Sequence, residues 1–595
     1  MKIKERSEIS KEYMWNLEDI YSNNEELEEE LKKLEKDWEI ISKMKGNLTS
    51  NSTNLLEGLV LRDEILRIVE KIFSYASMKF DEDTRVNESQ ELFDKAISLY
   101  SKSLDILSFI IPEILSADEN NLKKYIKEDS RLKIYEHFID DILRRKEHIL
   151  SDKEESIIAQ YSEALMAPEN IYSIFNGADL TFPVINKNGT EIEITQGNFI
   201  QLLEDRDREF RKKVFYEFYN VFFKFRNTLA STLNGNIKKN IITARIRNYS
   251  SALEASLSEN NVDVIVYDNL LDSIHRNLDS MHKYVEVRKK ALKLDEINMY
   301  DLYTPLVENI DDSIDYEKAK NMVLEGLKPL GDEYISIVEG AFKDGWIDVY
   351  ENKGKRSGAY SGGSYDTKPY ILLNYHERLD DVFTLAHELG HSMHSYYTRE
   401  NQPYINGNYS IFVAEVASTV NEILLLLDLL NKATNSKEKA YLLNHYLESF
   451  RTTVFRQAMF AEFEKSIYEY VEKDNAITAD YLNKTYRDLN RLYYGNSIIL
   501  DDLIDIEWAR IPHFYYNFYV YQYATGFCSA VTLANDIYNK KEGSLEKYIE
   551  FLKSGNSDYP LNVLKKAGVD MSTNEPLERS LKVFRNLVDE FDKLI

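Results

Sequence analysis

Two histidines, His387 and His391, stand four residues apart in this sequence, and a glutamate, Glu388, follows the first of them. On an α-helix, residues i and i+4 lie on one face, so both imidazoles can reach a single Zn²⁺ ion. Glu388 projects to the flank of that face, where its carboxylate can take a proton from a water molecule beside the ion. The segment predicts one zinc ion per chain and a hydrolytic reaction. The alternative is a polar helix surface without a metal.

A third zinc ligand must come from another segment. His394 continues the same face, but it lies seven residues from His387, about 10 Å along the helix, which is too far to share one ion. Glu415 is the better candidate, because it stands among small and apolar residues, where a carboxylate is rarely buried unless it is paired or binds metal. Glu422, two turns further along, is expected to hydrogen-bond a ligand histidine. A solvated stripe of glutamates remains the alternative.

These segments resemble one family of peptidases. The sequence HELGHSMH at 387–394, followed by FVAEVAS at 412–418, is similar to the thimet oligopeptidase family of zinc metallopeptidases, and within it to the oligoendopeptidase F branch. The resemblance extends over nearly the whole chain, with further matching segments at 15–21, 453–464, 511–516 and 552–571. It implies zinc ligation by His387, His391 and Glu415, with Glu388 as the base.

Composition limits the possible partners and compartment. The formal net charge of −27 opposes binding to nucleic acid or to anionic membrane surfaces. Cys528 is the single cysteine, so an intramolecular disulfide cannot form and a reducing cytoplasm is expected. The polar start of the sequence predicts no secretory signal, and the longest apolar run, 423–430, is too short for a membrane span. Oligomeric state is not indicated.

Helical periodicity dominates the sequence, so a mainly α fold is predicted. Charged and apolar residues alternate at helical spacing from about 27 to 167. Segments 180–185 and 190–195 then predict a β-hairpin with an Asn-Gly turn. We expect an N-terminal helical lobe at 1–196 and a catalytic domain at 197–595. The family resemblance implies helical lobes around a deep active-site channel, with a small β-sheet beside the zinc helix.

A strand is predicted directly before the zinc helix. The glycine-rich segment 357–365 contains Tyr360, and segment 369–375, which contains Leu373 and Asn374, has strand composition. An edge strand at this place can pair with an extended peptide through main-chain hydrogen bonds. Tyr360, Leu373 and Asn374 are therefore predicted to bind substrate. The alternative is an ordinary structural strand and loop.

The aromatic segment 513–526 contains candidate donors for the reaction. Hydrolysis of a peptide bond creates an oxyanion, and a histidine N–H or a tyrosine hydroxyl can stabilise it. Because aromatic packing alone could explain most of these tyrosines, the candidate histidine is the more informative residue. By resemblance, these roles fall on His513, Tyr516 and Tyr523, and the spacing leaves open which tyrosine donates; Tyr519 is a further candidate.

The sequence as a whole predicts a cytoplasmic zinc endopeptidase that cleaves internal bonds of short unstructured peptides. One alternative is a dipeptidyl carboxypeptidase or carboxypeptidase with the same zinc chemistry. That activity needs a fixed cation for the terminal carboxylate, and the sequence does not identify one. A non-catalytic helical peptide-binding protein is the other alternative.

Overall fold

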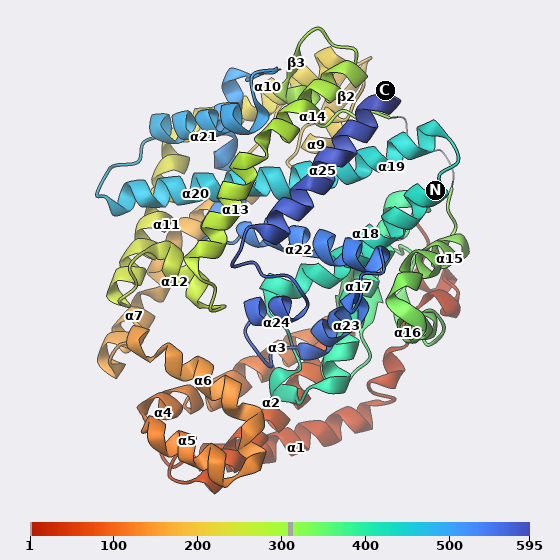
Figure 1. Cartoon of the computed structure of the whole chain (residues 1–595). Helices are drawn as coiled ribbons and strands as arrows, with labels where there is room; N and C mark the ends of the chain where they lie inside the picture. The colour runs from red at the N-terminus through yellow and green to blue at the C-terminus, as the bar shows by residue number, and fades with distance from the viewer. Residues whose placement is uncertain (1–2, 308–312) are drawn as a thin grey trace. The chain divides into compact units, whose positions relative to one another are not determined.

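The computed structural model describes residues 3–307 and 313–595 (Figure 1). The chain forms two compact units, each assembled from three segments. Unit 1 comprises Met1–Glu147, Asp312–Leu429 and Leu533–Val569, and unit 2 comprises His148–Asp311, Leu430–Thr532 and Asp570–Ile595. Helices make up most of both units, which confirms the predicted mainly α class. The predicted division after residue 196 stays a prediction.

Unit 1 combines a group of N-terminal helices with the helices that follow residue 312. Its N-terminal helices enclose an apolar core to which the sheet residues Tyr370 and Leu372 also belong. The helices are α1 (Asn24–Ser42), α2 (Ser52–Glu82), α3 (Asn87–Leu107), α4 (Ile110–Ser116), α5 (Glu119–Glu128), α6 (Glu136–Arg144), α15 (Tyr316–Leu327), α16 (Gly331–Lys343), α17 (Leu379–Asn401), α18 (Ile411–Lys432, of which the last turn is counted with unit 2), α23 (Ser544–Ser554) and α24 (Pro560–Lys566).

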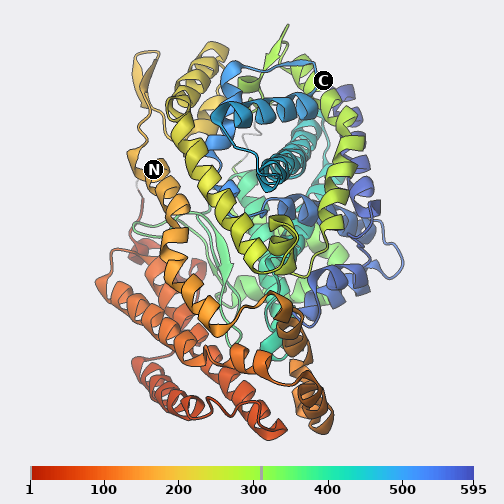
Figure 2. The same cartoon turned by 90° about the vertical axis from the view of Figure 1, so that its left-hand side faces the viewer.

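A three-stranded sheet in unit 1 precedes α17. Its strands are β4 (Ile347–Asp348), β5 (Tyr360–Gly362) and β6 (Tyr370–Leu372), in the order β4-β6-β5. β6 pairs in parallel with β4 and antiparallel with β5, so both of its edges are occupied. Figure 2 shows this green segment beside the red N-terminal helices. The prediction that the strand before the zinc helix is an edge strand is therefore wrong; the edge strands of this sheet are β4 and β5.

Unit 2 is also helical. Its β1 (Val184–Lys187) and β2 (Thr190–Glu193) form the predicted antiparallel hairpin, which is confirmed, and β3 (Ile297–Asn298) pairs with β7 (Ile498–Ile499). The helices are α7 (Asp152–Leu165), α8 (Ala167–Ile174), α9 (Phe199–Leu203), α10 (Arg208–Lys224), α11 (Arg226–Ile246), α12 (Ala252–Ser258), α13 (Val264–Arg276), α14 (Leu278–Ala291), α19 (Ser436–Ser449), α20 (Arg456–Glu472), α21 (Ala479–Tyr494), α22 (Tyr521–Tyr538, which continues into unit 1) and α25 (Glu575–Leu594). Within the described ranges, none of the helices is both long and apolar enough to span a membrane.

Candidate metal and catalytic site

Helix α17 carries both predicted histidine ligands, and its start is fixed by a local cap. The carboxylate of Asp381, in the first turn, accepts hydrogen bonds from the backbone N–H groups of His376 (3.0 Å) and Arg378 (2.9 Å). An acidic residue at this place also interacts favourably with the helix dipole. The helix ends at Asn401, two residues before Pro403, which cannot continue it.

Helix α18 packs closely against α17 at Gly390. A Cβ atom at this position would lie 2.5 Å from the Cα of Ser418 and 2.7 Å from the carbonyl oxygen of Ala417. Only glycine permits this approach without displacing backbone. One turn away, the buried Asn421 amide donates to the carbonyl of Ala386 at 3.1 Å. The two contacts fix the position of α18, and with it the carboxylates of that helix, against the histidines of α17.

The structure brings together the three predicted ligands in unit 1. The Nε2 atoms of His387 and His391 lie 3.2 Å apart, and Oε2 of Glu415 lies 3.4 Å from the first and 3.6 Å from the second. Ligands at about 2.0–2.1 Å from a tetrahedral zinc ion are separated by about 3.3–3.4 Å. The spacing and the N, N, O donor set therefore fit zinc. His394 is fully buried and stacks on Tyr409, away from this group of donors.

Each ligand histidine also forms a hydrogen bond on the side of its ring that faces away from Glu415. Glu422 Oε1 lies 2.5 Å from Nδ1 of His387, as predicted, and the ring of His391 hydrogen-bonds the Ala414 backbone. These bonds leave both Nε2 atoms directed to Glu415. Burial on its own lowers the pKa of His387, but the Glu422 hydrogen bond and the charges of Glu422, Glu388 and Glu415 together outweigh it, and the pKa rises to about 9. Burial and the nearby His387 lower the pKa of His391 to about 4.

Glu388 lies against the free edge of β5. Ile371 of β6 donates its backbone N–H to the carbonyl of Trp346, just before β4. Its partner Ser361 on β5 therefore belongs to a non-hydrogen-bonded pair, and the Ser361 N–H points away from the sheet. That N–H bonds the carboxylate of Glu388, and the Ser361 hydroxyl lies 2.8 Å from that of Ser392 on α17. Burial raises the pKa of Glu388 to about 7. A carboxylate with this pKa can both accept and release a proton near neutral pH.

The three residues predicted to bind substrate lie around the same sheet. Leu373 is buried and donates its N–H to Asp348, and the Asn374 amide donates to the carbonyls of Arg356 (3.0 Å) and Gly358 (2.8 Å). Leu373 and Asn374 also line a cavity of about 340 Å³, together with Gly358, Ala359, Asp381 and Thr384. The Tyr360 hydroxyl instead donates to Asp81 at 2.7 Å, which gives that side chain a structural partner.

The candidate oxyanion donors form a second cluster, within unit 2. The Tyr523 hydroxyl lies 3.5 Å from Nε2 of His513, the ring of Tyr519 lies roughly parallel to the imidazole at 6.2 Å, and the half-exposed Tyr516 is 5.7 Å from it. Burial lowers the pKa of His513, which favours the neutral imidazole. The cluster holds all four candidates. The metal ligands belong to unit 1, so a shared role with them stays a prediction.

Sequence reasoning missed the residue that holds this cluster's loop. Asn517 and Phe518 both have positive φ, 53° and 57°, a conformation that non-glycine residues adopt only under constraint. The Phe518 N–H donates to Oε1 of the fully buried Glu464 at 2.7 Å, and Ser256 donates to the Asn517 carbonyl at 2.7 Å. Strained backbone of this kind clusters at functional sites. Segment 453–464 is mostly apolar but carries Glu462 as well as Glu464, so nothing in the sequence singles out Glu464.

Comparisons with known proteins show the family of this chain. The model of peptidase family M3 matches residues 201–583, and that of oligopeptidase F matches residues 113–182. The chain belongs to peptidase family M3. It is 47% identical to oligopeptidase PepF of Bacillus subtilis over 592 residues, which cover 99% of this chain and 88% of that protein.

Solved structures give the same family for this M3 peptidase. A peptidase from Chlamydophila abortus has a TM-score of 0.94 at 35% identity, and covers 100% of both chains. Oligoendopeptidase-F from Enterococcus faecium has a TM-score of 0.74 at 38% identity, and covers 96% of this chain and 99% of that one. The chain is an oligoendopeptidase, and zinc use is general in its family.

Proposed function

We propose that this M3 peptidase hydrolyses internal bonds of short unstructured peptides with one Zn²⁺ ion held by His387, His391 and Glu415. The observation that carries the proposal is the triangle of donor atoms, with separations of 3.2, 3.4 and 3.6 Å, beside a buried glutamate. When bound, zinc would polarise the scissile carbonyl and activate a water molecule for attack. Three protein ligands leave a fourth position open, as in catalytic rather than structural zinc sites.

Glu388 is the general base in this proposal. Its carboxylate accepts the proton that the attacking water loses, and it then delivers that proton to the nitrogen of the leaving amine. Its burial and its raised pKa of about 7 support both transfers. Glu422 accepts the Nδ1 proton of His387, which keeps Nε2 unprotonated for the metal. Ser361 bonds Glu388 and so orients the base against β5.

His513 and a nearby tyrosine are the proposed donors to the oxyanion. Tyr523 is the first choice, because its hydroxyl lies at hydrogen-bonding distance from the imidazole, and Tyr516 and Tyr519 are the alternatives. A neutral His513 and a tyrosine hydroxyl each supply the N–H or O–H that such a role requires. The support is the cluster itself and the constrained backbone at 517–518 beside it.

Peptide binding is assigned to β5 rather than β6. The outer edge of β5 lies next to Glu388 and can pair with an extended peptide through main-chain groups other than the Ser361 N–H, which bonds Glu388, and a cavity containing Leu373 and Asn374 adjoins the start of β5. Strand-like pairing uses only a few residues, so peptides of about 6 to 20 residues are the expected substrates. The sequence has a single cysteine, the buried Cys528, and so cannot form an intramolecular disulfide, which supports the proposed cytoplasmic location.

Product analysis tests the proposal. A set of peptides graded by length is incubated with the zinc-loaded enzyme, with and without a chelator, and the fragments are identified by mass spectrometry. We expect internal cuts in short peptides, loss of all cuts with chelator, and no cleavage of a stably folded protein. Removal of residues only from one end would contradict the endopeptidase assignment, and undiminished cleavage after chelation would contradict the zinc site.

A further inference from the structure

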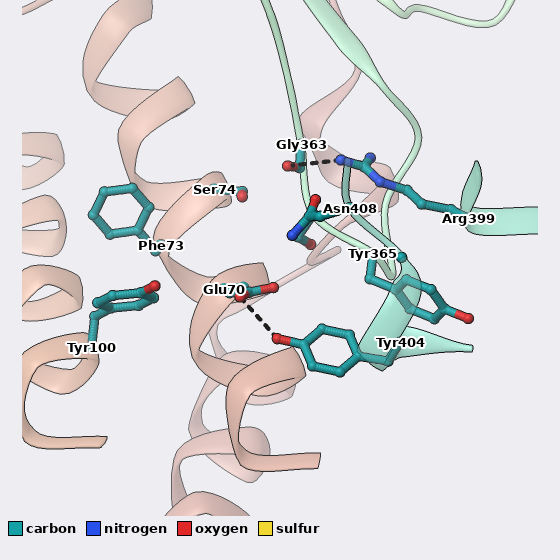
Figure 3. A pocket seen from close by; sticks show the side chains of 11 residues that line it. Glu70, Phe73, Ser74, Tyr100, Gly363, Tyr365, Arg399, Tyr404 and Asn408 are labelled. Atoms are coloured by element: carbon teal, nitrogen blue, oxygen red, sulfur yellow. Dashed lines mark hydrogen bonds between the residues drawn. The ribbon is translucent and has the colours of Figure 1, made fainter. Parts of the chain in front are cut away.

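A second cavity in unit 1 begins where β5 ends. Its volume is about 350 Å³, and Gly363, Ser364 and Tyr365, which follow β5 directly, form one side of it. In the view of Figure 3, the guanidinium of Arg399 lies on one side of the cavity and the rings of Phe73 and Tyr100 lie on the other. The size is that of a small-ligand site. β5 therefore connects Glu388 to this cavity.

Arg399 is a partly buried cation that has no hydrogen-bonded carboxylate partner among the described residues; Glu70 and Asp366 act on it through their charges alone. Within the described residues, its single hydrogen bond is from Nη2 to the Gly363 carbonyl, at a long 3.3 Å, and its buried Nη1 atom has no partner. The buried Ser364 hydroxyl oxygen also lacks a partner. Buried charges are normally paired, because an unpaired one loses its hydration without compensation. The cavity is the place where a compensating anion can bind.

The acidic residue of the cavity is already engaged. Glu70 accepts a hydrogen bond from Tyr404 at 2.8 Å, and burial raises its pKa although Tyr404 and the charge of Arg399 act in the opposite direction. The aromatic wall suits an apolar side chain. The arrangement thus offers a donor group for a carboxylate and a separate surface for the side chain next to it.

We propose that this cavity binds a carboxylate of the peptide substrate through Arg399. This inference rests on the proposed function, since it takes Glu388 as the place of the reaction. Glu388 and Arg399 stand eleven positions apart on α17, about 16 Å along the helix axis. An extended peptide advances about 3.3 Å per residue, so the carboxylate lies about five residues from the bond that is cut. The source is the C-terminal carboxylate or an acidic side chain.

The experiment compares peptides that share one cleavage sequence and have two to eight residues after the cut bond, each as free acid and as amide. For the zinc-loaded enzyme, we expect kcat/KM to be about 10- to 100-fold higher for the acid when about four to six residues follow the bond, and equal at other lengths. Arg399→Gln should abolish this acid-to-amide difference in kcat/KM, and Arg399→Lys should retain part of it. Arg131→Gln is the charge-matched control, because Arg131 is exposed and paired with Asp129; this variant should retain the full difference.

A second set of amidated peptides identifies the source. One glutamate is placed at each position before and after the cut bond, and a rate increase confined to positions about five residues away would assign the site to a side chain. Equal rates for acid, amide and every glutamate position would overturn the proposal. So would an Arg399→Gln enzyme that slows acids and amides equally.

Binding separates this proposal from the catalytic one. Calorimetric titration of a Glu388→Gln enzyme measures affinity without turnover. The ligand is one peptide with five residues after the cut bond, as free acid and as amide. A lower Kd for the acid, lost on adding Arg399→Gln, supports the carboxylate site even if Glu388 proves not to be the base. Equal Kd values for the two peptides refute it whatever the catalytic result. The comparison of acid with amide on wild-type Arg399 remains decisive if the Arg399→Gln protein does not fold.

Discussion

The glutamate behind His387 gives a quantitative test of the metal site. Glu422 Oε1 lies 2.5 Å from Nδ1 of His387, as expected of a charge-assisted hydrogen bond. Glu422→Gln keeps an acceptor oxygen and removes the charge, so the loss is the difference between a charged and a neutral hydrogen bond, about 1–2 kcal/mol. Zinc affinity should then fall about 5- to 30-fold. Glu422→Ala removes the acceptor as well and should approach a 100-fold loss.

The assay is competition for zinc with a chelator of known affinity, followed by kcat measured at saturating zinc. Glu339→Gln is the matched control, because Glu339 is a half-exposed glutamate of the same unit that forms an ion pair with Lys343. Its zinc affinity should equal that of the wild type. If Glu422→Ala binds zinc as tightly as the wild type, Glu422 does not support a ligand and the reasoning about His387 fails.

Four further predictions concern other parts of the two units. Glu388→Gln should retain about one zinc per chain, by elemental analysis, and lose most of kcat; zinc loss would contradict its role as a base. Gly390→Ala should lower the melting temperature and the zinc content, since overpacking costs about 1–3 kcal/mol. His513→Ala and Tyr523→Phe should each lower kcat about 10²- to 10³-fold with little change in KM, and unchanged kcat would assign both to packing. Burial raises the pKa of Glu464 to about 8, so the folded protein keeps a proton that the unfolded chain loses above about 4.5. The contribution of this group to the free energy of unfolding therefore falls as pH rises from about 4.5 to 8. The melting temperature of Glu464→Gln, relative to that of the wild type, should rise from about pH 5 to 8.

The donor triangle could be predicted because most of its geometry is local. The spacing of His387 and His391 fixes their shared face once the segment is helical. Predicting Glu415 and Glu422 also required the argument that carboxylates on an apolar helix need a partner. The structure places both beside the histidines. What the sequence could not supply is the exact distance between the helices, which depends on Gly390 meeting the backbone of Ser418.

The order of the strands could not be predicted. Segment 369–375 has the composition of a strand, but composition does not reveal its neighbours. β4 is only two residues long and gives no periodic signal, yet its pairing with Ile371 and Leu372 turns β6 into a central strand. The glycine-rich segment at 360–362, which was expected to be part of a loop, forms one of the two edge strands. The edge proposed to bind substrate therefore lies in the segment before the predicted strand.

The sequence also did not predict which charged residues are buried. For this reason the proposed carboxylate site at Arg399 was not expected. In the sequence, Arg399 is an ordinary basic residue in the last turn of a helix, where it balances the helix dipole. It lacks a hydrogen-bonded carboxylate because segment 363–365 folds back against α17 and offers the guanidinium only the Gly363 carbonyl. Glu464 is similar, since its burial depends on the loop at Phe518. The exopeptidase alternative required a fixed cation that the sequence could not identify; Arg399 is such a cation, but about five residues from Glu388 it suits internal cleavage of a peptide anchored at a distance.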